Sequence, residues 1–408
     1  MKKIVITGMG AVTPIGIGVD EYWKNLTEGK SGIDTIKSFD PSELAVQFAG
    51  EIKDFNPTDF LEKDLVRKTD PFMQYAYIAA EEALKQSGLT IEPERTGIVM
   101  GTAMAGVSTT AFTQDALSGA SHKKVGPRFI PKILGNIAAA NIAIDYNIQG
   151  PSFTVSTACS SGGDAIYIAA TYMQAGKADV MLAVGAESVL CPLVIYSLAN
   201  AKALSRRNDD PKTASRPFDV TRDGFVIGEG GGALVLETEE HALARGAKIY
   251  GEVKGCGNTC DAHHVTAPHP EGRGAIACMK QALADAGIDA SEIGYVNAHG
   301  TATNKGDTVE TGAIKSVFGD KLPYVSSTKG ATGHMMGAGG ITETIACVKA
   351  IETGIIPPTI NLNEIDPECE GIDFVPNTAK KADIRYAMSN AFGFGGQNSS
   401  IIVGKYEG

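Results

Sequence analysis

The sequence lacks three features that each mark a large class of proteins. It has no run of 18 apolar residues, so no transmembrane helix is expected. It has no excess of basic residues, and its formal net charge of −11 would repel a phosphate backbone, which argues against a general nucleic-acid binder. The number of its cysteines is odd, so they cannot all pair within the chain. Seven scattered thiols in 408 residues fit a reducing cytoplasm better than a disulfide framework.

What is present fits a globular enzyme with a large core. Apolar residues make up 43% of the chain and charged residues 20%. A length of 408 residues exceeds the usual single core, so two domains or two fused halves are expected. At the start, "MKKIVITGMGAVTPIGIGV", glycines and Pro14 interrupt the apolar run. We therefore expect a first buried strand at "IVITG" and no signal peptide.

An internal repeat organises the chain. The segment "EEALKQSGLTIEPERTGIVMGTA" (81–103) is similar to "KQALADAGIDASEIGYVNAHGTA" (280–302). Each shows a helix pattern, a glycine stop, a short linker and an apolar strand that ends in Gly-Thr. The sequence thus predicts two copies of one α/β unit, which we place at residues 1–245 and 246–408.

A second pair of segments lies at matching places beyond these copies. Residues 153–176, which contain "STACSSGGDA", and residues 324–354, which contain "STKGATGHMMGAGG", both fit a strand, a small polar turn and a long apolar helix. Helices that are apolar all round are buried. We therefore expect a sheet in each half, with helices between and outside the sheets.

Cys159 is the candidate nucleophile. A buried thiol often only packs, but this one is expected at a helix N-terminus, where the macrodipole lowers a thiol pKa and favours thiolate. The following "SSGG" is small enough to admit a substrate and leaves backbone N–H groups free for an oxyanion.

Two histidines are its candidate partners. His299 follows the second-copy strand, inside two residues that the first copy lacks, and His334 is expected to open the helix that mirrors the Cys159 helix. Lys329 would keep both rings neutral if it is buried beside them. In that case Asp307 and Glu310 would be needed to balance its charge.

The stretch "NAFGFGGQN" (390–398) is a candidate gate. It would supply a second oxyanion N–H, while Phe394 closes the pocket. Two other motifs are set aside: "ITGMGAVTP" lacks the third glycine of a dinucleotide fingerprint, and the cysteines and histidines of residues 256–269 lack zinc-finger spacing.

In combination these motifs resemble the β-ketoacyl-acyl-carrier-protein synthases, most closely the type II synthases of bacterial fatty-acid synthesis. The resemblance covers nearly the whole chain through "VITGMGAVTPIG", "GPSFTVSTACSSG", "TASRPFDVTRDGFVIGEGGGALVLE", "YVNAHGTAT", "VSSTKGATGH" and "NAFGFGG". It implies a duplicated α/β thiolase-type fold in five layers, αβαβα. That architecture agrees with the repeat.

The resemblance also implies a reaction: Cys159 accepts an acyl group from acyl carrier protein, malonyl-carrier protein loses carbon dioxide, and the resulting enolate attacks the acyl thioester. His299 and His334 would donate to the developing enolate, and the amides of Cys159 and Phe394 would hold the oxyanion. Further implied residues are Thr301, Thr303 and Thr266 along the phosphopantetheine channel, Met104 and Phe392 at the substrate, and Glu343 and Lys329 behind the histidines.

The implied partner is acyl carrier protein, which is acidic, so a local basic patch is needed on this acidic chain. The candidate residues are Lys63, Arg67 and Lys68 on one side of the entrance and Arg206 and Arg207 on the other. We expect no metal and no cofactor beyond the 4'-phosphopantetheine of the carrier. We also expect no nucleic acid or membrane partner, a cytoplasmic location, and a homodimer or a heterodimer with a chain-length factor.

Some alternatives stay open. Gln397 replaces the Thr or His common in type II synthases, and "CSSGG" is equally similar to polyketide ketosynthases. A degradative thiolase is disfavoured because no second cysteine lies in "GFGGQN", and a type III synthase because it would carry Asn in place of one histidine. A non-catalytic chain-length factor would lack Cys159. The sequence leaves the acyl length undetermined.

Overall fold

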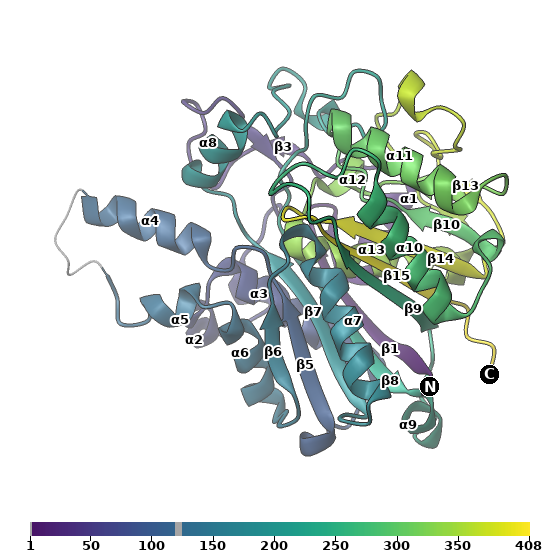
Figure 1. Ribbon diagram of the computed structural model, residues 1–408. Coiled ribbons are helices and arrows are strands. Elements are labelled where there is room, and N and C mark those ends of the chain that lie inside the picture. Colours follow the sequence, from purple (N-terminus) through teal and green to yellow (C-terminus); the bar gives the residue numbers. More distant parts are fainter. Residues whose placement is uncertain (1, 119–124) are drawn as a thin grey trace.

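The computed structural model describes residues 2–118 and 125–408, and it contains two matching sets of five strands (Figure 1). In spatial order, the first set is β6 (Ser152–Val155), β5 (Thr96–Gly101), β7 (Val180–Glu187), β8 (Gly230–Thr238) and β1 (Ile4–Thr13). The second set is β11 (Tyr324–Ser326), β10 (Ile293–Asn297), β14 (Tyr386–Phe392), β15 (Gln397–Gly404) and β9 (Gly251–Cys260).

The two sets share one topology, which confirms the predicted duplication. In each, the first three strands are parallel and the last two are antiparallel to their neighbours. The expectation of a separate sheet in each half needs one correction. Strands β1 and β9 pair antiparallel over Ile4–Ile6 and Gly251–Val253, so hydrogen bonds run continuously from one half into the other. The placement of the boundary after residue 245 stays a prediction.

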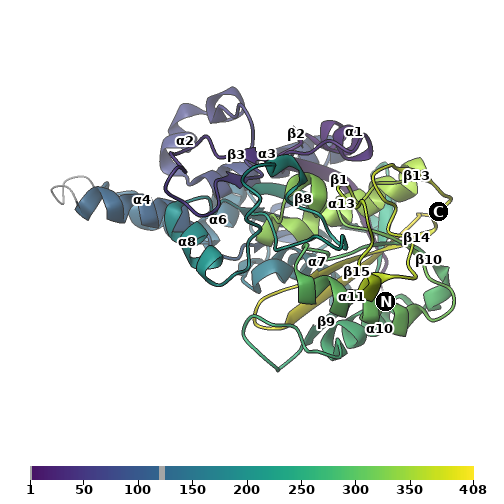
Figure 2. The same cartoon turned by 90° about the horizontal axis from the view of Figure 1, so that it is seen from above.

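Helices form the other three layers of the predicted αβαβα arrangement (Figures 1 and 2). The central helices α7 (Ser161–Gln174) and α13 (Gly339–Thr353) contact each other and the strands of both halves. Helices α3 (Pro71–Ser87) and α6 (Asn136–Tyr146) cover the outer face of the first half, and α10 (Arg273–Ala286) with α11 (Asn304–Phe318) covers the second. Buried apolar side chains of α7 and α13 explain why these two helices lie in the middle.

The glycines of "GMG" are explained by packing, because β1 continues well past the predicted "IVITG" to Thr13. A Cβ at Gly8 or Gly10 would lie 2.1 or 1.9 Å from a backbone carbonyl oxygen of α3. Gly255 and Gly257 repeat this contact in the second half, at 2.4 and 2.1 Å from carbonyls of α10. Only glycine lets strand and helix approach so closely.

Smaller elements surround this core. They are helices α1 (Val19–Thr27), α2 (Lys63–Lys68), α4 (Val107–Ser118), α5 (Phe129–Ile133), α8 (Pro192–Asn200), α9 (Glu239–Ala244) and α12 (Lys329–Thr332), and strands β2 (Gly16–Ile17), β3 (Asp34–Thr35), β4 (Phe48–Ala49), β12 (Ile355–Ile356) and β13 (Lys380–Lys381). Figure 1 shows α4 projecting from the body of the molecule. Within the described ranges, no helix has both the length and the apolarity to span a bilayer.

Candidate active site

Cys159 lies in a tight turn between β6 and α7. It belongs to the 3-10 turn η4 (Ala158–Ser160), and α7 begins two residues later at Ser161. Ala158 has a φ of +51°, a left-handed conformation that residues with a Cβ rarely adopt. The Thr157 amide donates to the Ser161 hydroxyl over 2.9 Å and closes the turn. The Cys159 side chain is only 8% exposed.

The glycines after this turn do not face a substrate, which corrects the prediction made for them. A Cβ on Gly162 would lie 2.7 Å from the Gly337 carbonyl oxygen, and one on Gly340 would lie 2.3 Å from the Gly163 nitrogen. These residues let the N-termini of α7 and α13 cross almost backbone to backbone. The crossing brings the segment that carries His334 next to Cys159.

The prediction that His334 opens the helix is wrong, because α13 begins only at Gly339. The His334 backbone forms a single β-bridge with Ile227: the His334 N–H donates to the Val226 carbonyl over 2.7 Å, and the His334 carbonyl accepts from the Gly228 amide over 2.9 Å. The motif "GFVIGEG" thus fixes the position of this histidine. The His334 Nε2 atom lies 2.9 Å from the Cys159 sulfur.

His299 lies in the loop that follows β10, and its ring faces that of His334. The two ring centroids are 5.3 Å apart with an interplanar angle of 85°. Glu310 of α11 fixes the loop, since its carboxylate accepts the amides of His299 and Gly300 over 2.8 and 2.7 Å. The repeat therefore predicted the place of His299 beyond a strand end, but not that of His334.

Lys329 is buried, and its carboxylate partner is Glu343 on α13. This contact corrects the expectation that Asp307 and Glu310 balance the lysine. Glu310 serves the His299 loop, while Asp307 accepts two other backbone amides and lies 3.7 Å from the Arg222 guanidinium. The resemblance had implied Glu343 as a supporting residue, and the structure places it there.

Burial dominates the electrostatics of the site. It lowers the pKa of His299 and His334 well below the usual value, and the nearby Lys329 charge lowers both further, so both imidazoles are neutral. Burial also raises the pKa of the Cys159 thiol to about 11, although the Lys329 charge opposes this. The predicted thiolate is therefore wrong for the free protein. The thiol must lose its proton to a neighbour, and His334 is in hydrogen-bond contact.

The predicted gate is the hairpin turn at residues 393–396, between β14 and β15. The Phe394 amide lies close enough to the Cys159 thiol to lower its pKa against burial, while the Phe394 side chain is 40% exposed. The Phe392 ring lies 5.9 Å from the His299 ring, centroid to centroid. The backbone of this turn thus touches the nucleophile while the Phe394 ring faces outwards.

The predicted channel threonines lie in two places. Thr301 and Thr303 follow His299, and their hydroxyl oxygens are 3.2 Å apart. Thr266 is exposed on the loop whose Val265 carbonyl accepts the Gly395 amide over 2.7 Å, so it lies beside the gate.

Glu187, which sequence reasoning missed, holds the other side of the site. This fully buried carboxylate at the end of β7 accepts the Thr102 hydroxyl and the amides of Ala103, Met104 and Gly337 over 2.6 to 3.2 Å. Burial raises its pKa to about 7 against these hydrogen bonds. The only sequence signal is a lone acidic residue after the apolar run "VMLAVGA".

Met104, predicted in the acyl pocket, is 38% exposed.

The predicted docking residues differ in their exposure and in the partners that they already have within the protein. All three basic residues of α2 are exposed, but Arg67 and Lys68 both pair with Asp64 of the same helix. Arg206 is exposed and donates to the Ala199 carbonyl over 3.3 Å, and Arg207 is half-buried and donates to the Thr221 carbonyl over 3.1 Å.

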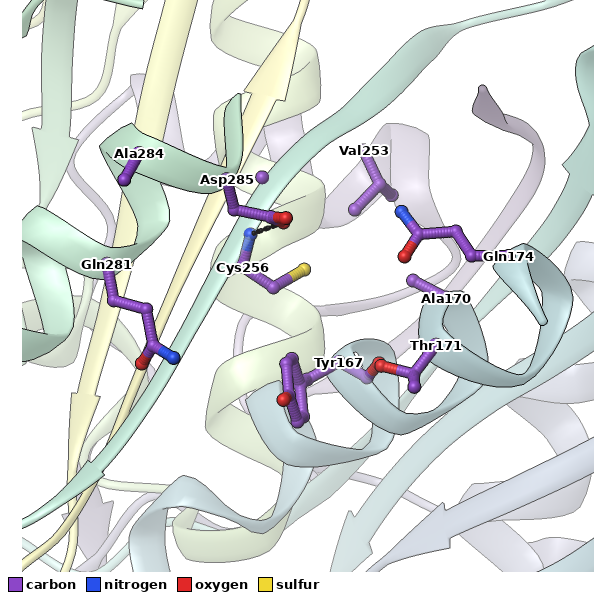
Figure 3. Close-up of a pocket in the computed structure, with 10 residues that line it drawn as sticks. Tyr167, Ala170, Thr171, Gln174, Val253, Cys256, Gln281, Ala284 and Asp285 are labelled. Carbon is purple, nitrogen blue, oxygen red and sulfur yellow. Dashed lines mark hydrogen bonds between the residues drawn. The ribbon is translucent and has the colours of Figure 1, made fainter. Parts of the chain in front are cut away.

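A separate cavity of about 410 Å³ lies between α7, β9 and α10 (Figure 3). Two of its polar side chains already serve the strand: Asp285 accepts the Cys256 amide, and Gln281 accepts the Asn258 amide, each over 2.9 Å. None of the predicted site residues lines this cavity.

Comparisons with known proteins agree with this geometry. Two family models match the chain, "Beta-ketoacyl synthase, N-terminal domain" over residues 1–242 and "Beta-ketoacyl synthase, C-terminal domain" over residues 250–363. A relative from Synechocystis, "3-oxoacyl-[acyl-carrier-protein] synthase 2", is 44% identical over 411 residues, which cover 100% of this chain and 99% of the relative.

Solved structures match over full length as well. The ishigamide ketosynthase/chain length factor is similar with a TM-score of 0.94 and 36% identity. A type II PKS acyl-carrier protein in complex with its ketosynthase bound to the hexaketide gives a TM-score of 0.90 and 32% identity. Each match covers 100% of both chains. Because sequence and fold agree over its whole length, the chain belongs to the β-ketoacyl synthase family and is a condensing enzyme of the acyltransferase class.

Proposed function

We propose that this protein elongates fatty acids by decarboxylating condensation of an enzyme-bound acyl group with malonyl-acyl carrier protein. The observation that carries the proposal is the 2.9 Å contact between the Cys159 sulfur and a neutral His334, with His299 beside them. Synthase 2 relatives at 43–45% identity over nearly the whole chain support fatty-acid elongation.

In the first half-reaction, the Cys159 sulfur attacks the thioester carbonyl of the acyl carrier. Its proton passes to His334 Nε2 and from there to the departing phosphopantetheine thiolate, so the ring ends neutral. The amides of Cys159 and Phe394 hold the oxyanion of the tetrahedral intermediate. The products are an acyl thioester on Cys159 and the free carrier thiol.

In the second half-reaction, malonyl-carrier protein loses carbon dioxide and becomes an enolate. The neutral imidazoles of His299 and His334 donate N–H groups to its thioester oxygen and stabilise the developing charge. His334 does this in the Nε2–H tautomer, whereas it accepts the Cys159 proton in the Nδ1–H tautomer. The enolate carbon attacks the acyl carbonyl, the bond to the Cys159 sulfur breaks, and the released sulfur takes up a proton from solvent. No cofactor is needed beyond the phosphopantetheine that carries both substrates, and metal chemistry has no part in these steps.

Acyl carrier protein is the proposed partner, docked on the basic residues of α2 and on Arg206. A ketosynthase complex with its carrier protein among the similar structures supports this partner. The unpaired cysteines are compatible with work in a reducing cytoplasm.

We also propose that the protein is a homodimer joined through β6. This strand ends the hydrogen-bonded order, and no other strand of the described residues pairs with its outer edge. Large exposed apolar side chains accompany it on α4, α6, α7 and the segment 129–134: Phe112, Ile130, Leu134, Ile144 and Tyr172. Sedimentation velocity of the wild type and of Thr154→Pro tests this proposal. The wild type should sediment as a dimer, and the variant, which alters β6, should sediment as a monomer. A monomeric wild type would contradict the proposal.

A type II polyketide ketosynthase is the second candidate, because two of the similar structures come from polyketide-type systems. Products distinguish the candidates: a fatty-acid enzyme extends saturated acyl groups, whereas a polyketide enzyme extends its own β-keto products. A chain-length factor is disfavoured by the intact pairing of Cys159 with His334.

The test of the main proposal is intact-mass analysis after incubation with acyl-carrier proteins of different chain lengths. Wild type should gain one acyl mass, and Cys159→Ala should gain none. Cys256→Ala, which removes another buried thiol, should behave as wild type. An acyl adduct on Cys159→Ala would refute the assignment.

A further inference from the structure

The three reactive side chains also form a set of metal ligands. The Cys159 sulfur and one ring nitrogen each from His299 and His334 lie within 4.8 Å of one another. In the described part of the chain, this is the one group of three or more Cys, His or acidic residues that is so close. Sulfur and imidazole are ligands that Zn²⁺ prefers. We propose that the substrate-free enzyme binds one Zn²⁺ ion here, as a reversible inhibitor and not as a cofactor.

The spacing of the three ligand atoms is close to that of a tetrahedral zinc site. Zinc bonds of about 2.3 Å to sulfur and about 2.0 Å to nitrogen, at tetrahedral angles, separate the ligand atoms by about 3.3 to 3.6 Å. The Cys159–His334 contact of 2.9 Å is slightly shorter, and all three separations lie below 4.8 Å. Each separation therefore lies within about 1.5 Å of the one that tetrahedral zinc requires. Three protein ligands leave the fourth position to water.

The ligand atoms of the site suit a metal. An imidazole binds a metal through a ring nitrogen that carries no proton, and each histidine has one ring nitrogen within 4.8 Å of the other two ligand atoms. Cys159 must give up its proton, so each Zn²⁺ that binds forms one zinc–sulfur bond and releases one proton. The Lys329 charge opposes a cation, but its contact with Glu343 offsets much of that charge.

The surroundings of the ligands keep the affinity moderate. In built zinc sites the second nitrogen of each histidine donates to a carboxylate or carbonyl group. Here the Nδ1 atoms of His299 and His334 are buried and have no hydrogen-bond partner among the described residues. A metal held without such partners is expected to exchange, and chelators should remove it.

Acylation and zinc binding must exclude each other, because a thioester sulfur cannot act as a thiolate ligand. Zn²⁺ should therefore compete with acyl carriers for the free enzyme and leave the acyl-enzyme untouched. The binding rests on the side chains alone, and only its effect on acylation rests on the proposed function. At about ten times its dissociation constant, Zn²⁺ should slow acylation about tenfold.

The chain offers a matched control. Cys260 and His263 belong to the sulfur- and histidine-rich segment at residues 256–269, outside the catalytic machinery. A metal bound there could also slow the reaction through the neighbouring gate. The double variant Cys260→Ser/His263→Asn removes these two ligands and leaves the three proposed ones in place.

The experiment titrates cobalt(II) chloride into the whole protein under argon and follows the thiolate-to-cobalt charge-transfer band, with zinc chloride as the competitor. Wild type and Cys260→Ser/His263→Asn should show the band with one equivalent of metal, and Zn²⁺ should abolish it. Cys159→Ala, and wild type alkylated at Cys159 with iodoacetamide, should show none.

Absence of the band from wild type, its persistence in Cys159→Ala, or its loss in the Cys260→Ser/His263→Asn variant would overturn the site. If the band forms but Zn²⁺ leaves the acylation rate unchanged, the inhibitory role is refuted. If acylation is absent even with EDTA and no metal, the proposed function fails while the band still reports on the site.

Discussion

Replacing Lys329 with methionine keeps most of the side-chain volume but leaves Glu343 buried without its partner. Breaking a buried ion pair from one side costs about 3–5 kcal/mol of unfolding free energy. The double variant Lys329→Met/Glu343→Gln removes both charges and should recover most of that loss. Lys380→Met, which breaks a surface pair with Asp373, should change the unfolding free energy little.

The loss in the single variant should depend on pH in one direction. Burial raises the folded-state pKa of Glu343, and without Lys329 nothing in contact opposes this. A carboxyl whose pKa is raised by folding stabilises the fold when it is protonated. The single variant should therefore be most stable at low pH and lose stability as pH rises through the folded pKa of Glu343. Urea unfolding at several pH values measures this dependence.

Removing the Lys329 charge should also move the pH dependence of acylation. Burial is the larger cause of the lowered pKa of His334, and the Lys329 charge is the second. Without that charge, His334 is protonated at higher pH and cannot take the Cys159 proton. The acid limb of the acylation rate, followed by quenched intact mass, should shift to higher pH in the double variant. An unchanged limb would refute the role of Lys329.

Three further predictions concern other parts of the site. Glu187→Gln turns an amide group toward backbone donors, so unfolding free energy should fall by about 1–3 kcal/mol, and Cys159 alkylation should extend to lower pH because a nearby negative charge is gone. An unchanged alkylation profile would contradict this. Met104→Trp should slow acylation by twelve-carbon carriers more than by two-carbon carriers, since each excluded methylene is worth about 0.8 kcal/mol. An unchanged ratio of the two rates would place Met104 outside the tunnel. Charge reversal of Arg67 and Lys68 to Glu should raise KM for carrier-bound substrates and spare short thioester analogues. Equal effects on both substrates would refute docking at α2.

The fold followed from the sequence because its repeat is carried by local signals. Gly88 and Gly287 both take left-handed conformations that end matching helices, and apolar strands follow both. The extent of β1 was missed because "GMG" has the composition of a turn. The two glycines are there because helix α3, about 70 residues later in the sequence, packs against the strand at these positions. No local sequence pattern contains that contact.

The clustering of Cys159, His299 and His334 was predicted, but the electrostatics of the cluster were predicted less well. Motif order brought Cys159, His299 and His334 together, whereas the thiol pKa depends on burial that the whole fold creates. His334 was placed at a helix start because its apolar, glycine-rich neighbours resemble those of Cys159. Glu187 was missed because a single acid at a strand end carries no pattern. Its role appears only when distant amides converge on it.

The two-histidine decarboxylation is tested most directly by the variant Cys159→Gln, incubated with malonyl-carrier protein alone. A side-chain amide in place of the thiol mimics the acylated state, and the two neutral histidines remain to donate to the developing enolate. We expect steady release of carbon dioxide from this variant and loss of that release when His299→Ala is added. No release from Cys159→Gln, or release that survives the loss of His299, would contradict the two-histidine decarboxylation.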